Sequence, residues 1–247
     1  MPRHNVKVAK RANRPNPRTE RNLHILPNPD SERLKRVQLI PRNLSQEVYV
    51  EALADPTKYI VIAVGVAGTG KTVLATEYAI RAYQEGLYKK IIITRPAVSV
   101  DERLGFLPGN LLAKMEPWMI PIMDVFKTYY SVKAVHNMLL NEVIEIAPLG
   151  FMRGRTFKNA IVIADEMQNS TIAQTKMVLT RIGENSRIIM TGDLKQHDRG
   201  YETNGMGDFV TRLKQQPNDG IAIVEFSPRD VERHCIIEHI LRLYGEE

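Results

Sequence analysis

Residues 65–72 have the types and spacing that most clearly predict chemistry in this sequence. They read Gly-Val-Ala-Gly-Thr-Gly-Lys-Thr and fill every fixed position of the phosphate-binding pattern G-x-x-x-x-G-K-[S/T]. Glycines let the backbone wrap closely around a polyphosphate with its N–H groups pointing inward. The lysine then reaches the β- and γ-phosphates, and the threonine hydroxyl binds Mg²⁺. The predicted nucleotide contacts are Gly65, Val66, Ala67, Gly68, Thr69, Gly70, Lys71, Thr72 and Val73, with Thr72 also a metal ligand and Lys71 also catalytic.

The segments on both sides of this loop are the elements that must position it. Residues 59–64 are apolar and β-branched, as in a buried strand, and residues 73–83 have the pattern of a helix. A helix that starts at the loop brings the positive end of its dipole to the phosphates. A glycine-rich turn that matched the pattern by chance would lack this context, so we favour the phosphate-binding interpretation.

Two adjacent acids supply the partner that such a loop needs. Asp165 and Glu166 follow the apolar segment 160–164, which predicts a strand that ends in two carboxylates. Asp165 is placed to hold Mg²⁺ through its water shell, and Glu166 to orient and deprotonate a water that attacks the γ-phosphate. The predicted strand 90–94 lies between the loop and the acids, an order typical of hydrolases rather than small-molecule kinases. Without the loop, a strand end with solvated acids would explain both residues.

Gln196 lies in a similar position after another predicted strand, residues 187–191. Neighbouring strands of a parallel sheet open at the same carboxyl edge, where ligands bind. Gln196 could therefore contact the γ-phosphate or the attacking water and distinguish a triphosphate from a diphosphate. A polar loop residue with no such role is the alternative.

Strand-like and helix-like segments alternate beyond residue 40. The six predicted strands span residues 59–64, 90–94, 143–147, 160–164, 187–191 and 221–226, and helical patterns include residues 171–182 and 229–244. Such alternation predicts an α/β fold with a mostly parallel sheet and helices on both faces. Residues 101–141 look less regular because Pro108, Gly109, Pro117 and Pro121 interrupt them, and a long insertion of this kind often carries function.

Charge is distributed unevenly along the 247 residues. The whole chain has a net charge of +6, and residues 1–22 alone carry seven Lys and Arg against one acid, Glu20, which also nets +6. Five prolines between residues 2 and 29 oppose a helix there. We therefore predict a disordered or extended basic tail over residues 1–35 and one domain over residues 36–247. The tail could bind phosphate backbones without reading their sequence, or it could only aid solubility.

Other features of the sequence argue against a membrane or secreted protein. No apolar run approaches the roughly 18–20 residues that span a bilayer, and no apolar segment follows the basic N-terminus as in a signal peptide. Cys235 is the only cysteine, so no intrachain disulfide forms, and no Cys/His cluster has zinc spacing. We expect a cytoplasmic protein.

Several motifs together resemble the PhoH-like ATPases, a P-loop group related to one core domain of superfamily 1 helicases. The matching segments are residues 65–72, 94–96, 104–109, 146–149, 152–156, 165–169, 179–183, 191–196 and 230–234. Residues 104–109 and 152–156 are specific to the family, whereas the P-loop alone is not. Val66 and Met167 stand where the family often has Pro and Ala, and neither position carries the chemistry. The resemblance implies a RecA-like sheet, ATP and Mg²⁺ as ligands, and a bacterial cytoplasm, or that of the host if a phage encodes the protein.

By this resemblance, Gln46 is similar to the glutamine that reads adenine in related helicases. Its side-chain amide can both donate to and accept from an adenine edge, which GTP would not satisfy. The alternative is an exposed glutamine in a predicted helix over residues 46–54.

ATP hydrolysis spreads charge over the γ-phosphoryl oxygens, which an arginine usually contacts. Superfamily 1 helicases supply that arginine from a second core domain, and this chain has the pattern of only one. We therefore expect a ring oligomer, with a hexamer favoured, in which Arg229 or Arg233 of a neighbouring subunit completes the site. A surface salt bridge is the commoner role for any one arginine. The candidates are Arg95, Arg153, Arg155, Arg181, Arg229 and Arg233.

Four arginines are instead candidates for nucleic-acid contact: Arg95, Arg103, Arg153 and Arg155. Residues 105–108 could form a pore loop. No ribonucleoprotein-type aromatic pattern is present, so binding of RNA or single-stranded DNA should be backbone-directed and salt-sensitive. The first functional hypothesis is an Mg²⁺-dependent ATPase coupled to remodelling of RNA or single-stranded DNA, as in helicases. The second is an ATP-gated switch that binds nucleic acid or protein and hydrolyses ATP incidentally. Glu166 favours the first, because a pure switch needs no water-activating carboxylate.

Overall fold

The computed structural model describes residues 35–96, 111–196 and 204–232, together with Ile236 and Leu243. The side chains of residues 111–117 are not described. Several sequence predictions therefore concern residues outside the described part of the chain. These are the basic tail up to residue 34, Arg103, the pore-loop segment 105–108 and Arg233.

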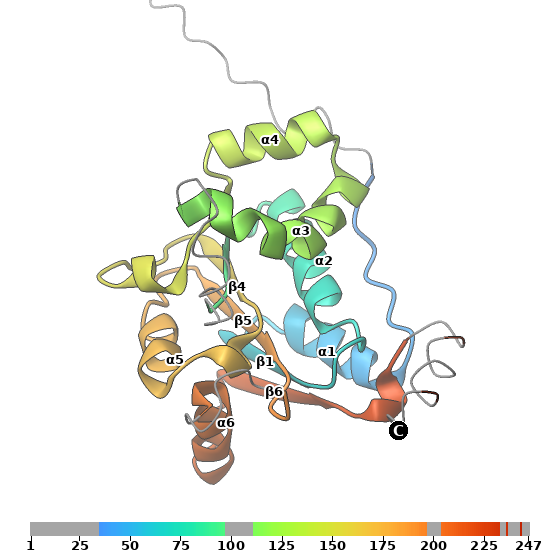
Figure 1. The fold of residues 1–247 in the computed structure, drawn as a ribbon, viewed down its shortest axis with the longest axis vertical. Coiled ribbons are helices and arrows are strands. Elements are labelled where there is room, and N and C mark those ends of the chain that lie inside the picture. Colours follow the sequence, from blue (N-terminus) through green and yellow to red (C-terminus); the bar gives the residue numbers. More distant parts are fainter. Residues whose placement is uncertain (1–34, 97–110, 197–203, 233–235, 237–242, 244–247) are drawn as a thin grey trace, which may run out of the picture.

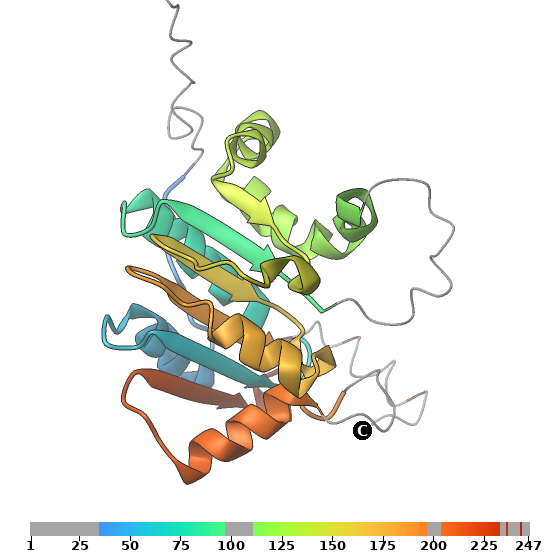
Figure 2. The same cartoon turned by 90° about the vertical axis from the view of Figure 1, so that its left-hand side faces the viewer.

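A six-stranded parallel sheet forms the centre of the molecule, with the strand order β3-β2-β4-β5-β1-β6 (Figure 2). Each predicted strand is present, and its ends lie within one residue of the predicted ones. The fold class expected from the sequence, an α/β fold with a parallel sheet, is confirmed. The strands are β1 (Ile60–Gly65), β2 (Lys90–Thr94), β3 (Ile144–Ile146), β4 (Ala160–Ala164), β5 (Arg187–Gly192) and β6 (Ile221–Phe226).

Helices cover both faces of the sheet, as the continuous apolar strands require (Figure 1). Side chains alternate along β1, so that Val61 and Ala63 join one apolar core while Ile60 and Ile62 join the other. The first core lies under α1 (Leu44–Ala54), α2 (Lys71–Gln84), α3 (Leu111–Tyr129) and α4 (Val132–Leu140). The second lies under α5 (Ile172–Leu179) and α6 (Gly205–Gln215). The sheet is therefore held rigidly between two layers.

Helices α3 and α4 correct the expectation that residues 101–141 are irregular. Within the described residues, this region is almost entirely helical, although Pro117 and Pro121 lie inside α3. The two prolines are four residues apart, so the hydrogen bonds that they remove fall on one side of the helix. Met119, Ile122 and Phe126 are buried in the first core. Tertiary packing of this apolar face outweighs the local preference that the prolines express.

The C-terminal prediction also needs correction, because no helix begins at Arg229. Residues Pro228–Asp230 form a single 3₁₀ turn, and Val231 is extended with φ −71° and ψ 117°. The Asp230 carboxylate accepts hydrogen bonds from the backbone N–H and the hydroxyl of Ser227, at 2.7 and 2.9 Å. This local capping closes the turn after residue 230. Beyond residue 232 the structure describes only Ile236 and Leu243, and both are helical, as the sequence predicted.

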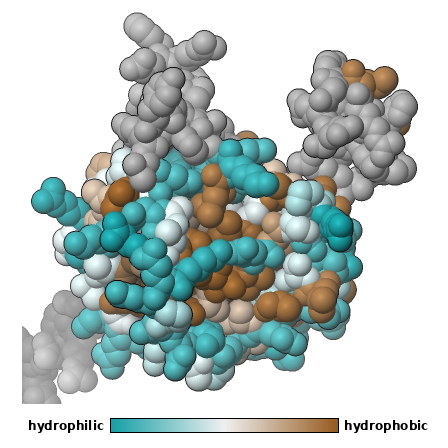
Figure 3. Space-filling view, turned by 90° about the horizontal axis from the view of Figure 1, so that it is seen from below, coloured by the Kyte–Doolittle hydropathy of each residue, from teal (hydrophilic) through white to brown (hydrophobic). Residues whose placement is uncertain are grey.

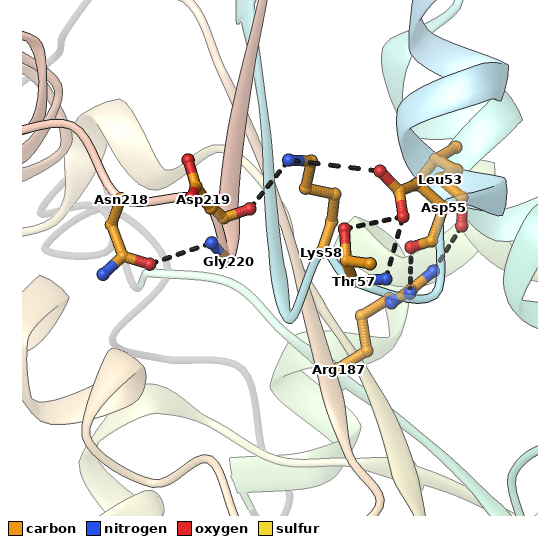
Figure 4. A network of polar contacts seen from close by, with 8 residues as sticks. All are labelled: Leu53, Asp55, Thr57, Lys58, Arg187, Asn218, Asp219 and Gly220. Atoms are coloured by element: carbon orange, nitrogen blue, oxygen red, sulfur yellow. Dashed lines mark hydrogen bonds and ion pairs between the residues drawn. The ribbon is translucent and has the colours of Figure 1, made fainter.

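Arg187, at the start of β5, connects the C-terminal end of α1 to the sheet through hydrogen bonds (Figure 4). Its side chain is buried and donates hydrogen bonds to the carbonyls of Leu53 and Asp55 and, at 2.7 Å, to the Tyr78 hydroxyl. The guanidinium also lies 5.6 Å from the centre of the Tyr78 ring. A cation at the last carbonyls of α1 satisfies groups that the helix leaves unpaired and complements its dipole. The position of α1 matters because its other end reaches the phosphate-binding loop.

Strand β6 is a sheet edge that remains partly open. Among the described residues it pairs only with β1, and Ile221 and Ile223 are half-buried. Viewed from below, the face nearest β6 shows apolar side chains at its centre with polar ones around them (Figure 3). None of the described helices is both long and apolar enough to cross a membrane.

Candidate nucleotide-binding site

The loop between β1 and α2 begins and ends at positions where a positive φ favours glycine. Gly65 has a φ of +148°, and a Cβ there would lie 2.2 Å from the Phe226 carbonyl oxygen of β6. Gly70 caps α2 in the left-handed conformation, with a φ of +81° and ψ of 6°. These two glycines turn the chain out of the strand and into the helix. The loop N–H groups and the N-terminus of α2 then face the same space.

Lys71, the first residue of α2, is held back against the loop. Its ammonium donates to the carbonyls of Gly65 and Val66, both at 2.7 Å, and to the Thr69 hydroxyl at 3.2 Å. Burial lowers the pKa of Lys71, and three carboxylates act in the opposite direction. They belong to Asp193, Glu166 and Asp165. The lysine is therefore a buried cation in an acidic neighbourhood, close to where a phosphate chain would enter.

Asp165 brings the loop and the acidic motif together. The residue is buried, and its Oδ1 accepts hydrogen bonds from Thr72 at 2.7 Å and from Thr191 at 2.5 Å. Strand β5 separates β1 from β4 in the sheet, so the loop and Asp165 face one another across the end of β5, where Thr191 lies. The structure thus brings together Thr72 and Asp165, the two metal ligands predicted from the sequence, and adds Thr191, which sequence reasoning missed. Its place at the end of a predicted strand was the available signal.

Glu166 adopts the left-handed conformation, with φ 54° and ψ 38°, and its carboxylate is partly exposed. Gln168 Nε2 donates to Glu166 Oε2 at 2.5 Å, and Arg95 Nη2 lies 3.5 Å from Glu166 Oε1. A non-glycine residue with positive φ is uncommon and often occurs at functional sites. Here that backbone conformation sends the side chain in a different direction from Asp165.

Lys71, Thr72, Asp165, Glu166 and Thr191 line one open cavity of about 240 Å³, the phosphate cavity. Gln196 also lies in its wall, so the sequence prediction that it shares an edge with the two acids agrees with the structure. Sequence reasoning missed Asp193, whose Oδ2 is buried without a hydrogen-bond partner among the described residues. The lining residues are Ala67, Gly68, Gly70, Lys71, Thr72, Val73, Asp165, Glu166, Thr191, Gly192, Asp193 and Gln196.

The oxygens in this cavity fit a magnesium ion that is shared with a phosphate chain. Within the described residues, no group of three or more His, Cys, Asp or Glu could hold a metal by itself. Mg²⁺ typically keeps several waters and binds one or two protein oxygens together with substrate phosphates. The Thr72 hydroxyl beside the Asp165 carboxylate is such a pair, and the unpaired Asp193 oxygen is a further acceptor for bound water.

A second cavity of about 460 Å³ adjoins the first and shares Gly68, Gly70 and Val73 with it. Gln46 of α1 is buried in its wall and connects two segments. Its Nε2 donates to the Thr69 carbonyl at 3.1 Å, while its Oε1 accepts from the Arg42 N–H at 2.8 Å. The other residues around this cavity include Gln38, Ile40, Leu74, Glu77, Tyr129 and Glu232. Gln46 thus connects α1 to the phosphate-binding loop and also faces the second cavity.

The predicted arginines are spread around the molecule. Arg95 contacts Glu166 and donates to the Trp118 carbonyl at 3.1 Å, so it lies at the site rather than on an outer surface. Arg155 is paired with Glu145 of β3, an ion pair that lowers the pKa of Glu145. Arg181 donates to the Arg155 carbonyl at 3.2 Å.

Two other arginines, Arg153 and Arg229, are exposed. Arg229 belongs to a segment that runs along the chain's own loop, because the Glu232 N–H donates to the Gly68 carbonyl at 3.0 Å. Of the predicted nucleic-acid residues that the structure describes, Arg95 contacts Glu166, Arg155 is paired with Glu145, and Arg153 is exposed.

A parallel sheet with a phosphate-binding loop after β1 and an acidic motif after β4 is the architecture of a P-loop nucleotide-binding protein. A family model described as PhoH-like protein matches residues 38–245, so the chain belongs to the PhoH-like family.

Curated relatives agree with this assignment. A PhoH-like protein of Bacillus subtilis is 41% identical over 83% of this chain. A PhoH-like protein of Mycobacterium tuberculosis is also 41% identical over 83% of this chain, and Protein PhoH of Escherichia coli is 39% identical over 84%. The matches cover 64%, 57% and 58% of those three proteins, so this chain spans less than two-thirds of their length.

Proposed function

We propose that the protein is an Mg²⁺-dependent ATPase. The observation that carries the proposal is the convergence of Lys71, the Thr72–Asp165 pair and Glu166 on one cavity of about 240 Å³. A phosphate-binding loop alone would support nucleotide binding without turnover. The added carboxylate, Glu166, is a group that can take a proton from water, which hydrolysis requires.

Each residue has a defined part in this mechanism. Backbone N–H groups of the loop and the N-terminus of α2 bind the phosphates, and Lys71 exchanges its loop carbonyl acceptors for phosphate oxygens. Thr72 and Asp165 would hold Mg²⁺, which neutralises charge on the β- and γ-phosphates when bound. Glu166 orients the attacking water and accepts its proton, and Gln196 contacts the γ-phosphate or this water.

The second cavity is where we place the nucleobase. It opens directly beside Gly68 and Gly70, and Gln46 in its wall carries an amide that can donate and accept. The two hydrogen bonds that Gln46 makes to Arg42 and Thr69 leave one donor and one lone pair for a base. This combination suits adenine and supports ATP over GTP as the substrate.

We further propose that ATP hydrolysis is coupled to remodelling of RNA or single-stranded DNA. The basic charge of residues 1–22 and the exposed Arg153 support contact with a phosphate backbone. An ATP-gated switch that binds nucleic acid or protein is the second candidate. The position of Glu166 in the phosphate cavity favours turnover over such a switch.

A ring of subunits, with a hexamer favoured, is proposed to complete the site. Lys71 is the only cation in the wall of the phosphate cavity that the described residues form, and Arg229 is exposed without an ion-pair partner among them. The half-buried edge of β6 is a surface that a neighbouring subunit could cover. Sedimentation equilibrium tests this proposal. Full ATPase activity in a strictly monomeric protein would contradict the idea that Arg229 or Arg233 of a neighbouring subunit completes the site.

Steady-state ATP hydrolysis tests the central proposal. Lys71→Ala should weaken nucleotide binding and hydrolysis together, because a charged phosphate contact is lost; unchanged ATP affinity by calorimetry would contradict this. Glu166→Gln should keep ATP bound while kcat falls by about 10²- to 10⁴-fold, the usual contribution of a general base. The matched control is Glu184→Gln, an exposed glutamate remote from the cavity, which should behave as wild type.

Single-stranded RNA and DNA, added at two salt concentrations, separate the two candidate functions. Stimulation of hydrolysis that fades as salt rises would support coupling to a nucleic-acid backbone. Hydrolysis that is indifferent to both polymers would favour the switch or a protein partner. Near-wild-type turnover in Glu166→Gln would show that the base is assigned wrongly.

A further inference from the structure

Gln168 connects the carboxylate of Glu166 to the end of strand β5. Its Nε2 donates to Glu166 Oε2 at 2.5 Å, and its Oε1 accepts from the backbone N–H of Asp193 at 3.1 Å. Gln168 is 4% exposed; its hydrogen bond to Asp193 is buried, and the one to Glu166 is partly buried. One amide therefore bridges two strand ends, the end of β4 that carries Glu166 and the end of β5 that carries Asp193.

The backbone around Gln168 is shaped for this bridge. Residues Met167–Asn169 form a 3₁₀ turn, which directs Gln168 back toward Glu166. A Cβ on Gly192 would lie 2.7 Å from Gln168 Oε1 and 3.1 Å from its backbone nitrogen. Glycine at this position lets β5 approach the turn closely, because any larger residue would push the amide away.

We propose that Gln168 is a positioning residue for Glu166, an inference that rests on the proposed ATPase activity. Glu166 is partly exposed, and its other contact, to Arg95 at 3.5 Å, is long for a hydrogen bond. The bond from Gln168 is therefore the one that fixes the direction of the carboxylate. Because the Asp193 N–H holds the other end of the amide, the direction of Glu166 depends on the β5 loop, which lines the phosphate cavity.

A purely structural role is the competing explanation, in which Gln168 only satisfies the buried N–H of Asp193. Two substitutions separate the roles, because an ionised glutamate has the same shape and still accepts from that N–H but cannot donate to Glu166. Gln168→Met removes both hydrogen bonds at similar volume. A structural role predicts that Gln168→Glu keeps wild-type ATP hydrolysis and that only Gln168→Met hydrolyses ATP more slowly. A positioning role predicts that both are impaired.

The experiment measures ATP hydrolysis, ADP affinity by calorimetry and thermal unfolding for wild type, both variants and Gln215→Glu. The last adds the same charge at an exposed position on α6 and should leave all three unchanged. In Gln168→Glu we expect kcat to fall by about 10²-fold, the scale for a misplaced catalytic group. The ADP affinity and the unfolding temperature should stay as in wild type. If Gln168→Met does not fold, Gln168→Glu decides alone.

Wild-type kcat in Gln168→Glu would overturn the positioning role and leave the ATPase proposal intact. A loss of ADP affinity equal to the loss of kcat would also overturn it, since the residue would then support binding. A wild-type protein that hydrolyses no ATP would overturn the proposed function itself, and this inference with it.

Discussion

Replacing Arg187 by leucine should strongly destabilise the protein, because it removes the buried cation that attaches α1 to the sheet. Three hydrogen bonds disappear, to the carbonyls of Leu53 and Asp55 and to the Tyr78 hydroxyl. Leucine fills most of the space but leaves these acceptors without a donor. Leu53 is fully buried, so water cannot replace the arginine there.

The magnitude follows from the number and kind of these bonds. A hydrogen bond from a charged donor contributes about 1.5 kcal/mol or more, so three bonds contribute about 4.5 kcal/mol. Removing one partner of a buried charged interaction costs about 3–5 kcal/mol, the same range as this sum. We therefore expect the free energy of unfolding to fall by about 3–5 kcal/mol. At about 2–4 °C per kcal/mol for a domain of this size, Tm should fall by about 10 °C.

Chemical denaturation and calorimetric melting measure this loss. The matched control is Arg212→Leu on α6, whose side chain is 70% exposed and, among the described residues, pairs only with Asp208, so the free energy of unfolding should change by less than about 0.5 kcal/mol. Tyr78→Phe should cost about 1 kcal/mol, since only one of the three bonds is lost. A loss below about 1 kcal/mol in Arg187→Leu would refute the reasoning and show that apolar packing alone holds α1.

Two further predictions concern the loop and the far edge of the sheet. Gly65→Ala should cost at least about 2 kcal/mol and weaken nucleotide binding, because its Cβ would clash with the Phe226 carbonyl at 2.2 Å; Gly150→Ala, with open space around it, should be near neutral in the same melts. Glu145→Gln should cost about 1 kcal/mol at pH 7, where the ion pair with Arg155 is intact. That pair lowers the folded-state pKa of Glu145. Its contribution to the free energy of unfolding is therefore fully present above the usual glutamate pKa of about 4.3 and is lost as pH falls through the lowered pKa. Denaturation curves of the two proteins should therefore converge in strong acid, and a difference that persisted there would contradict the assignment.

Helix α3 shows where local reasoning from the sequence failed. Pro117 and Pro121 predict an interruption, because proline removes backbone hydrogen bonds and clashes with the preceding turn. The structure continues the helix through both, since Met119, Ile122 and Phe126 bury their side chains in the core. The same principle acts in reverse at the C-terminal end, where capping by Asp230 closes a short turn that the helical pattern did not predict. Long-range packing thus decided the backbone of α3, and a local side-chain cap decided the turn at residues 228–230.

The strands, the phosphate-binding loop and the acidic pair of Asp165 and Glu166 could all be predicted from the sequence. Runs of β-branched residues and a fixed pattern of glycines carry that information locally. The position of β5 between β1 and β4 could not be predicted in this way, because strand order depends on long-range packing. That order places Thr191 on Asp165 and Gln168 between Glu166 and Asp193. The hydrogen bonds from Thr191 to Asp165 and from the Asp193 N–H to Gln168 join strand ends that are distant in the chain, so no spacing in the sequence could have predicted them.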